Sequence, residues 1–195
     1  MLRELRPALL MLLVLTLITG GAYPLLVTGI AQVAFPRQAG GSLIVEGRHI
    51  AGSALIGQSF TSPGVFWSRP SATVVPYDAG ASGGSNLGPT NPALFAAIRA
   101  RVAALRAADP DNAALVPADL VTASASGLDP DISPAAAEYQ VARVARECGI
   151  DPARVRALVA RQIEPRAFGL LGEPRVNVLA LNRALASLPG SALRP

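Results

Sequence analysis

The pattern of hydrophobic and polar positions divides the chain into an apolar N-terminal segment and a longer region of mixed character. Residues 7–36 carry no charged side chain, and residues 8–26 are the most apolar part of this stretch. About 20 helical residues cross the roughly 30 Å core of a bilayer, and a helix satisfies its own backbone hydrogen bonds there. The pattern therefore predicts a membrane anchor over residues 1–36, with the span at about residues 8–30.

A cleaved signal peptide is the alternative for this segment. Arg3 and Arg6 would form its basic end, and the small residues at 20–22 would offer a cleavage site. The apolar character continues to Phe35, whereas the apolar core of a signal peptide is only about 7 to 15 residues long. The length of the run favours a retained anchor.

The residues in and around the span indicate its orientation and its contacts. Arg3 and Arg6 precede it, so the positive-inside rule places the N-terminus in the cytoplasm and the region after residue 36 outside. Gly20 and Gly21 would let another helix approach closely, and Pro24 would loosen the second half of the span. These three residues are therefore candidates for contact with a membrane partner.

The first part of the soluble region predicts short strands and loops. Residues 42–45 are strand-like and lie between glycines, while residues 54–56 and 59–60 are ambiguous. Residues 61–92 form a long stretch rich in proline, glycine and serine. A loop of this length is usually functional or ordered by a partner, and it could also separate two lobes.

The second part predicts four helices. Their starts are marked by Asn91-Pro92, Ser133-Pro134, Asp151-Pro152 and Asn177, and Gly149 marks the end of the second helix. Apolar residues then recur at helical spacing. The side chains predicted to face the core are Leu94, Ile98, Val102, Leu105, Val141, Val144, Ala145, Val155, Leu158, Val159, Ile163, Val178, Leu181 and Leu185. Strands followed by helices predict one soluble α+β domain over residues 37–195.

Composition excludes several classes of protein. Hydrophobic residues make up 51% of the chain and charged residues 15%, which excludes an intrinsically disordered protein. The single cysteine, Cys148, excludes an internal disulfide scaffold and a cysteine-ligated zinc site. The net charge is +4 without a dense basic run, so nothing indicates a nucleic-acid partner.

The candidate chemical groups form no clear site. His49 is the only histidine, and it reads as a structural or surface residue. The two Asp-Pro-Asp steps, 109–111 and 129–131, are better explained as turns than as ligands of a hard cation. Ser124 or Ser126 could be a nucleophile only if His49 served as its base. We therefore predict no catalytic residues and no metal site.

Residues 81–88 look like a phosphate-binding loop but lack its decisive residues. The stretch has neither the Gly-Lys-Ser/Thr ending of a P-loop nor the spacing of a dinucleotide fingerprint. We expect a tight polar loop that packs against another surface, and we consider a partner subunit as that surface. The residues proposed for this contact are Ser82, Gly83, Gly84, Ser85 and Asn86.

Six strings of sequence carry a resemblance to a known family. In order, they are LITGGAYPL at 17–25, GSALIGQSFT at 52–61, FWSRPSA at 66–72, ASGGSNLGPTNP at 81–92, DLVTASASGLDPDISP at 119–134 and VNVLALN at 176–182. Together they resemble the C subunit of the bacterial Kdp potassium-transporting ATPase, from about Leu5 to Leu188. One such string would be weak evidence, and six in order are strong.

The resemblance implies a non-catalytic accessory subunit of a complex in the bacterial inner membrane. Its partners would be a channel-like potassium subunit, a P-type ATPase subunit and the lipid bilayer. The complex hydrolyses ATP to import potassium. The family's C subunit has been described as a catalytic chaperone that raises the nucleotide affinity of the ATPase subunit. No cofactor would be tightly bound, and ATP would act only through the ATPase subunit.

The resemblance also implies one candidate nucleotide contact, Gln140, which matches a family glutamine proposed to contact ATP. An outside location for the domain would keep ATP away from this residue, so we favour a local or partner-bonded role for it. Two alternatives remain open for the whole chain. One is a nucleotide-binding regulator on the cytoplasmic side, and the other is an anchored serine hydrolase.

Overall fold

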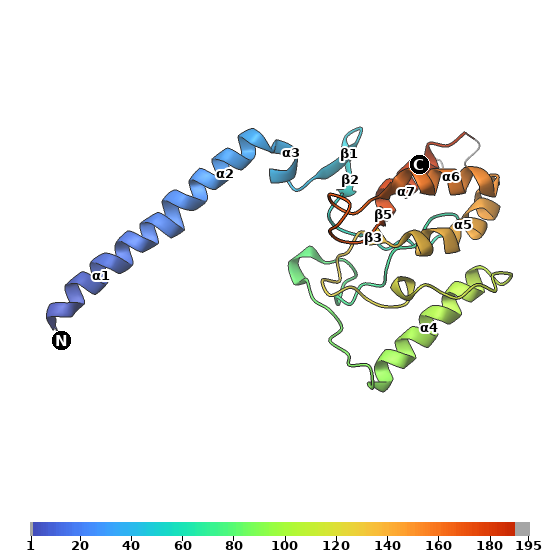
Figure 1. The fold of residues 1–195 in the computed structure, drawn as a ribbon, viewed down its shortest axis with the longest axis horizontal. Helices are drawn as coiled ribbons and strands as arrows, with labels where there is room; N and C mark the ends of the chain where they lie inside the picture. The colour runs from blue at the N-terminus through green and yellow to red at the C-terminus, as the bar shows by residue number, and fades with distance from the viewer. Residues whose placement is uncertain (1, 190–195) are drawn as a thin grey trace. The chain divides into compact units, whose positions relative to one another are not determined.

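The structure, a computed structural model, describes residues 2–189 of the 195-residue chain (Figure 1). The chain divides into two compact units, residues 1–51 and residues 52–195. The anchor was predicted to end at residue 36, where the chain would leave the membrane. No membrane boundary is defined by the two units, so this end stays a prediction. The predicted fold class is confirmed, because a long apolar helix precedes a region of mixed helix and sheet.

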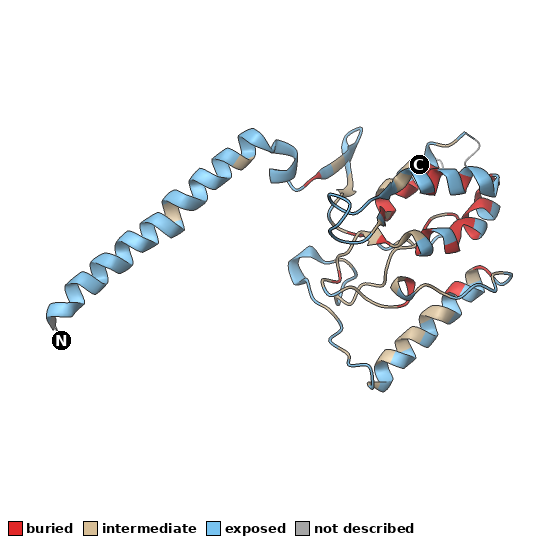
Figure 2. Cartoon of the chain, viewed as in Figure 1, coloured by how far each residue is buried: buried red, intermediate tan, exposed pale blue. Residues whose placement is uncertain are grey.

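The first unit is built mainly from one long helical segment. Helix α1 (Leu2–Leu17) continues through a π-helical turn, η1 (Ile18–Ala22), into α2 (Tyr23–Ala34), and the short α3 (Pro36–Ala39) follows. The segment Arg3–Ala34 is long and apolar enough to cross a membrane, and its apolar side chains lie exposed (Figure 2). A signal sequence would also meet these criteria, so retention of the span stays a prediction.

The π-helical turn has a cause in the sequence. Pro24 has no N–H to donate and its ring crowds the preceding turn, which disrupts the regular hydrogen-bond ladder. The N–H of Tyr23 donates to the carbonyl of Ile18, five residues back, which is the π register. The π-helical turn at ITGGA therefore accommodates the proline, and the helix continues without a break.

A short hairpin lies at the C-terminal end of this unit. Strand β1 (Leu43–Glu46) pairs with β2 (His49–Ser53), and Gly47 takes a positive φ of 60° in the turn between them. The predicted strand at 42–45 is thus confirmed with a shift of one residue. Residues 54–56 and 59–60, which were ambiguous, form no strand.

Over its described residues, 52–189, the second unit combines four helices with a small sheet. Its helices are α4 (Pro92–Ala108), α5 (Pro134–Cys148), α6 (Pro152–Gln162) and α7 (Val178–Ala186). Strands β3 (Asp131–Ile132), β5 (Arg175–Asn177) and β4 (Ile163–Glu164) form an antiparallel sheet in that order. Two single 3-10 turns, η2 (Ala79–Ala81) and η3 (Ala118–Leu120), lie in the long connections.

The core lies where α5, α6, α7 and the sheet meet, as the buried residues in Figure 2 show. The predicted caps hold: the side chains of Ser133, Asp151 and Asn177 each accept a hydrogen bond from a first-turn N–H. Gly149 ends α5 in the left-handed conformation that glycine tolerates best. The predicted core residues of α5 and α7 are all buried.

Two expectations differ from the structure. Ile163 was predicted to extend the inward face of α6, but α6 ends at Gln162 and Ile163 begins β4 at 36% exposure. The sheet pairing with Val176 draws it out of the helix. The loop at 61–92 was considered as a divider between two lobes. It lies within the single unit that starts at residue 52.

Candidate functional site

The helix surface around Gly20 and Gly21 is open. Apart from the neighbouring residues and the helix's own backbone, no described atom lies within 4 Å of the position that a β-carbon on Gly21 would take, and the nearest to Gly20 is the Thr16 side chain at 3.9 Å. Pro24 follows on the first turn of α2. The three residues therefore lie in or next to the π-helical turn. Their contact with a partner helix stays a prediction.

The loop predicted at residues 82–86 packs first against its own chain. The Gly83 N–H donates to the Ser126 carbonyl at 2.8 Å, and the Ser82 hydroxyl donates to the same oxygen at 3.1 Å. A β-carbon on Gly84 would lie 3.0 Å from the Ala125 carbonyl, so glycine permits this approach. Ser85 and Asn86 remain exposed. Contact of this loop with a partner stays a prediction.

The other candidate groups are engaged in local structure. The hydroxyl of Ser124 accepts the Gly127 N–H at 2.9 Å, and that of Ser126 accepts the Leu128 N–H at 3.1 Å, so both close a turn. His49 is an exposed residue of the first unit. Within residues 2–189, no three histidine, cysteine or acidic side chains gather as metal ligands.

Gln140 lies at the centre of a buried polar network. Its side chain is 1% exposed. The amide oxygen accepts from the Trp67 N–H and from Arg143 Nη2, both at 2.7 Å. The amide nitrogen donates to the carbonyls of Trp67 and Ala136, both at 3.2 Å. Both amide hydrogens and both oxygen lone pairs are therefore used.

Asn182 of α7 binds the backbone of Phe66 in the same way that Gln140 binds the backbone of Trp67. Its amide oxygen accepts the Phe66 N–H at 2.8 Å, and its amide nitrogen donates to the Phe66 carbonyl at 2.9 Å. Arg143 donates to the carbonyls of Pro63 and Val65. We call this set of side chains, Gln140, Arg143 and Asn182, the backbone clamp. It fixes residues 63–67 to α5 and α7.

Arg143 holds its charge in the interior without an acidic partner among the described residues. Its side chain is 2% exposed, and burial lowers the pKa of its guanidinium to about 10. It is therefore still a cation at neutral pH. Carbonyl oxygens and the Trp67 ring, whose centroid lies 4.7 Å from the guanidinium carbon, replace its hydration.

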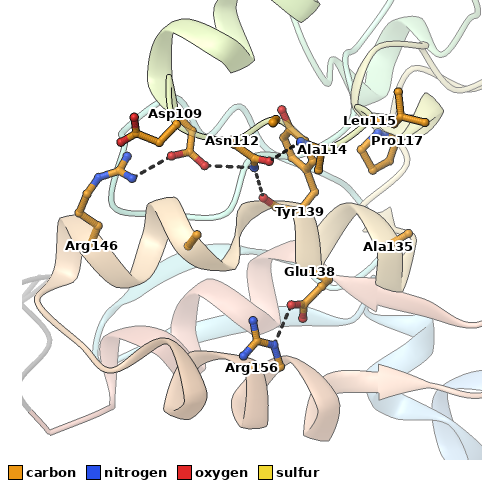
Figure 3. A pocket seen from close by; sticks show the side chains of 13 residues that line it. Asp109, Asn112, Ala114, Leu115, Pro117, Ala135, Glu138, Tyr139, Arg146 and Arg156 are labelled. Carbon is orange, nitrogen blue, oxygen red and sulfur yellow. Dashed lines mark hydrogen bonds and ion pairs between the residues drawn. The ribbon is translucent and has the colours of Figure 1, made fainter.

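A pocket of about 590 Å³ lies between the 109–117 loop and α5 (Figure 3). Asp109 is buried at its edge, where it accepts from Arg146 at 2.8 Å and from Asn112 at 3.1 Å. The Tyr139 hydroxyl is buried with no hydrogen-bond partner in the described chain, and burial raises its pKa. The pocket carries mixed charge and no nucleophile–base pair.

Comparison with known proteins gives this fold a family. The model of the K+-transporting ATPase c chain, KdpC, matches residues 5–187. The chain belongs to the KdpC family. The potassium-transporting ATPase KdpC subunit of Sorangium cellulosum is 66% identical over 186 residues, which is 95% of this chain and 98% of the relative. That of Polaromonas naphthalenivorans is 65% identical over 185 residues, 94% of each chain. That of Methylococcus capsulatus is 64% identical over 189 residues, 96% of this chain and all of the relative.

Membership in the KdpC family confirms the resemblance found in the sequence. The nucleotide contact that the resemblance implies for Gln140 stays a prediction. In the structure this amide has no free hydrogen-bonding position, and a contact with ATP would require the clamp to open.

Sequence reasoning missed the other members of the clamp. Asn182 lies inside a string that carries the family resemblance, as does Trp67, whose backbone the clamp holds, and Arg143 lies one turn after Gln140. The available signal was a polar residue on the inward face of a helix, since such a residue needs a buried partner. The identity of that partner, a loop backbone more than 70 residues away, had no local signature.

Proposed function

We propose that this chain is the non-catalytic accessory subunit of an ATP-driven potassium importer. In this role it assembles with the channel-like and ATPase subunits and supports ATP-coupled potassium uptake. It lies in the bacterial inner membrane through one span, with its N-terminus in the cytoplasm and residues 37–195 outside. ATP is bound and hydrolysed by the ATPase subunit, and this chain holds no cofactor of its own.

The family membership supports the complex, and the apolar helix supports the membrane location. The polar groups of the second unit support a role through shape. Gln140, Asn182 and Ser124 are all engaged in hydrogen bonds that hold the fold. A subunit of this kind shifts a conformational equilibrium only through its different affinity for the two states, and a coupling of about 1 to 3 kcal/mol is ordinary.

Deletion of the chain from the operating complex tests the role. We expect that the cells no longer grow in medium of low potassium concentration and that potassium-stimulated ATPase activity is lost. The remaining subunits should also associate less strongly. Full potassium-stimulated activity in a stable complex without this chain would refute the proposal. Reporter fusions after Pro195 test the location, since one reporter is active only outside the cytoplasm and the other only inside.

The competing function is a nucleotide-binding regulator on the cytoplasmic side. Gln140→Ala alone cannot separate the two, because it also opens the backbone clamp. Asn182→Ala opens the neighbouring half of the clamp and leaves the Gln140 amide in place. If Gln140 contacts ATP, only its own variant raises the ATP KM of the complex. If the role is structural, both variants change activity in the same direction.

A further inference from the structure

The hairpin between β4 and β5 ends in a cluster of exposed apolar side chains. Phe168 is 93% exposed, Leu170 79% and Leu171 64%. Every residue from Ile163 to Glu173 is exposed, so the tip stands clear of the core. Single exposed apolar residues are normal, whereas a contiguous group on a protein surface marks a site of interaction.

The tip is closed by hydrogen bonds of its own backbone. The N–H groups of Ala167 and Leu171 each donate to the other's carbonyl at 2.9 Å. The Gly169 N–H donates to the Arg166 carbonyl at 3.0 Å, and Phe168 takes a positive φ of 54°. A positive φ is unfavourable for a bulky side chain. Phe168 is thus presented outward on an ordered turn, which reduces the entropy cost of binding.

The charges beside the tip argue against a lipid surface as its contact. Arg166 pairs with Glu173 at 2.6 Å, and Arg175 pairs with Glu164 at 2.7 Å across the strands. The stem of the hairpin is therefore neutral. A segment that enters an anionic membrane surface typically carries surplus basic residues and interfacial Trp or Tyr, and residues 163–175 contain neither tryptophan nor tyrosine.

The size of the tip argues against a second copy of this chain. Three side chains of this kind expose on the order of 400 Å². Two tips packed together would bury roughly 800 Å² in total, which is the size of a crystal-packing contact and below a stable interface. A contact of about this area can still form between two proteins that already bind each other through other surfaces, because the second contact then forms at high effective concentration.

We propose that residues 168–171 dock into an apolar pocket on another protein subunit of the potassium-transporting complex, with Phe168 as the anchor. This inference rests on the proposed function, which supplies a partner held by other contacts. It adds the surface of this chain that makes the contact and the chemistry of the surface that receives it. That surface is a concave apolar pocket with a neutral rim.

Photocrosslinking in membranes that contain the complete complex tests the proposal. A photoreactive phenylalanine analogue replaces Phe168 in one variant and Leu115 in the other. Leu115 is the matched control, because it is also 93% exposed and lies on a different loop of the same unit. We expect an adduct with another subunit from position 168 only. An adduct with lipid, an adduct with a second copy, equal yields at both positions or no adduct would each overturn the proposal.

The double substitution Phe168→Ala with Leu170→Ala gives the quantitative test. Loss of a central apolar anchor is expected to weaken the association of the complex in detergent at least about tenfold, while Leu115→Ala leaves it unchanged. Unchanged Trp67 fluorescence would show that the variant is folded. If the double variant assembles and transports like the wild type while deletion of the chain abolishes uptake, the docking tip is refuted and the accessory role stands.

Discussion

The backbone clamp gives the sharpest prediction for stability. Gln140→Ala removes four hydrogen bonds at a site that is 1% exposed. The Ala136 carbonyl keeps the partner that the helix gives it. The Trp67 N–H, the Trp67 carbonyl and Arg143 Nη2 lose theirs. The substitution therefore leaves one polar group of the clamp and two of the backbone that it holds short of a partner.

The magnitude follows from those groups. Each buried polar group left without a partner costs about 1–3 kcal/mol, and groups bonded to a charge lie at the upper end. Partial access of water to the Trp67 backbone lowers the sum, so we expect a loss of about 3–5 kcal/mol. The whole stability of a domain is about 5–15 kcal/mol. With a typical urea slope for a small domain, the unfolding midpoint should fall by about 2 M.

Fluorescence of Trp67 measures this directly, because it is the only tryptophan of the chain and is in contact with Gln140 and Arg143 of the clamp. The full chain would be unfolded with urea in detergent. Glu138→Ala is the matched control, since it removes a hydrogen-bonded side chain from the same helix. The Glu138–Arg156 pair, 2.7 Å apart, is exposed on both sides and is expected to contribute less than about 1 kcal/mol. Equal midpoints for the two variants would refute the reasoning.

Four further predictions concern single side chains. Cys148 is buried, donates to the Gly64 carbonyl at 3.1 Å and has a thiol pKa raised by burial, so alkylation at pH 8 should be slow until urea unfolds the domain. Burial, with a smaller contribution from the nearby Asp129, raises the pKa of the Asp131 carboxyl. The folded state therefore binds a proton more readily than the unfolded state, and the stability of the wild type relative to Asp131→Asn should rise as the pH falls from neutral toward about 4. Tyr139→Phe removes a buried hydroxyl that lacks a partner in the described chain and should leave the unfolding midpoint unchanged or slightly higher. Gly127→Ala should destabilise by about 2 kcal/mol or more in the same urea assay, because φ is +68° and the new β-carbon would lie 2.7 Å from the Gly83 carbonyl.

The helices of the second unit could be predicted because their signals are local. Ser133 and Asp151 are capping residues followed by proline, and Gly149 is a stop signal, so three short patterns define α5 and the start of α6. The apolar spacing then identified the buried faces. These features depend on residues within one or two turns of each other, which a single sequence displays.

The sheet and the clamp could not be predicted in the same way. Strands β3, β4 and β5 are two or three residues long, and β3 pairs with β5 across more than 40 residues of chain. So short a strand has no alternation to detect. Ile163 shows the result, since its spacing fits the helix and its pairing places it in the sheet. Gln140 could be placed on a helix, but its partner could not be named.

The distribution of polar groups in the second unit bears on how such a chain could act. A catalytic or ligand-binding domain keeps perturbed polar groups available to a substrate, since these carry its chemistry. Here the most deeply buried polar side chains, Gln140 and Arg143, are consumed in holding the backbone of residues 63–67. One group of exposed apolar side chains in this unit lies at the hairpin tip around Phe168. A rigid interior with an apolar tip fits a subunit that acts by shape and docking, and it predicts that substitutions in the clamp and at the tip impair the complex by different routes. Clamp variants should lower the stability of the isolated chain, whereas tip variants should leave that stability unchanged and lower only the association with the other subunits.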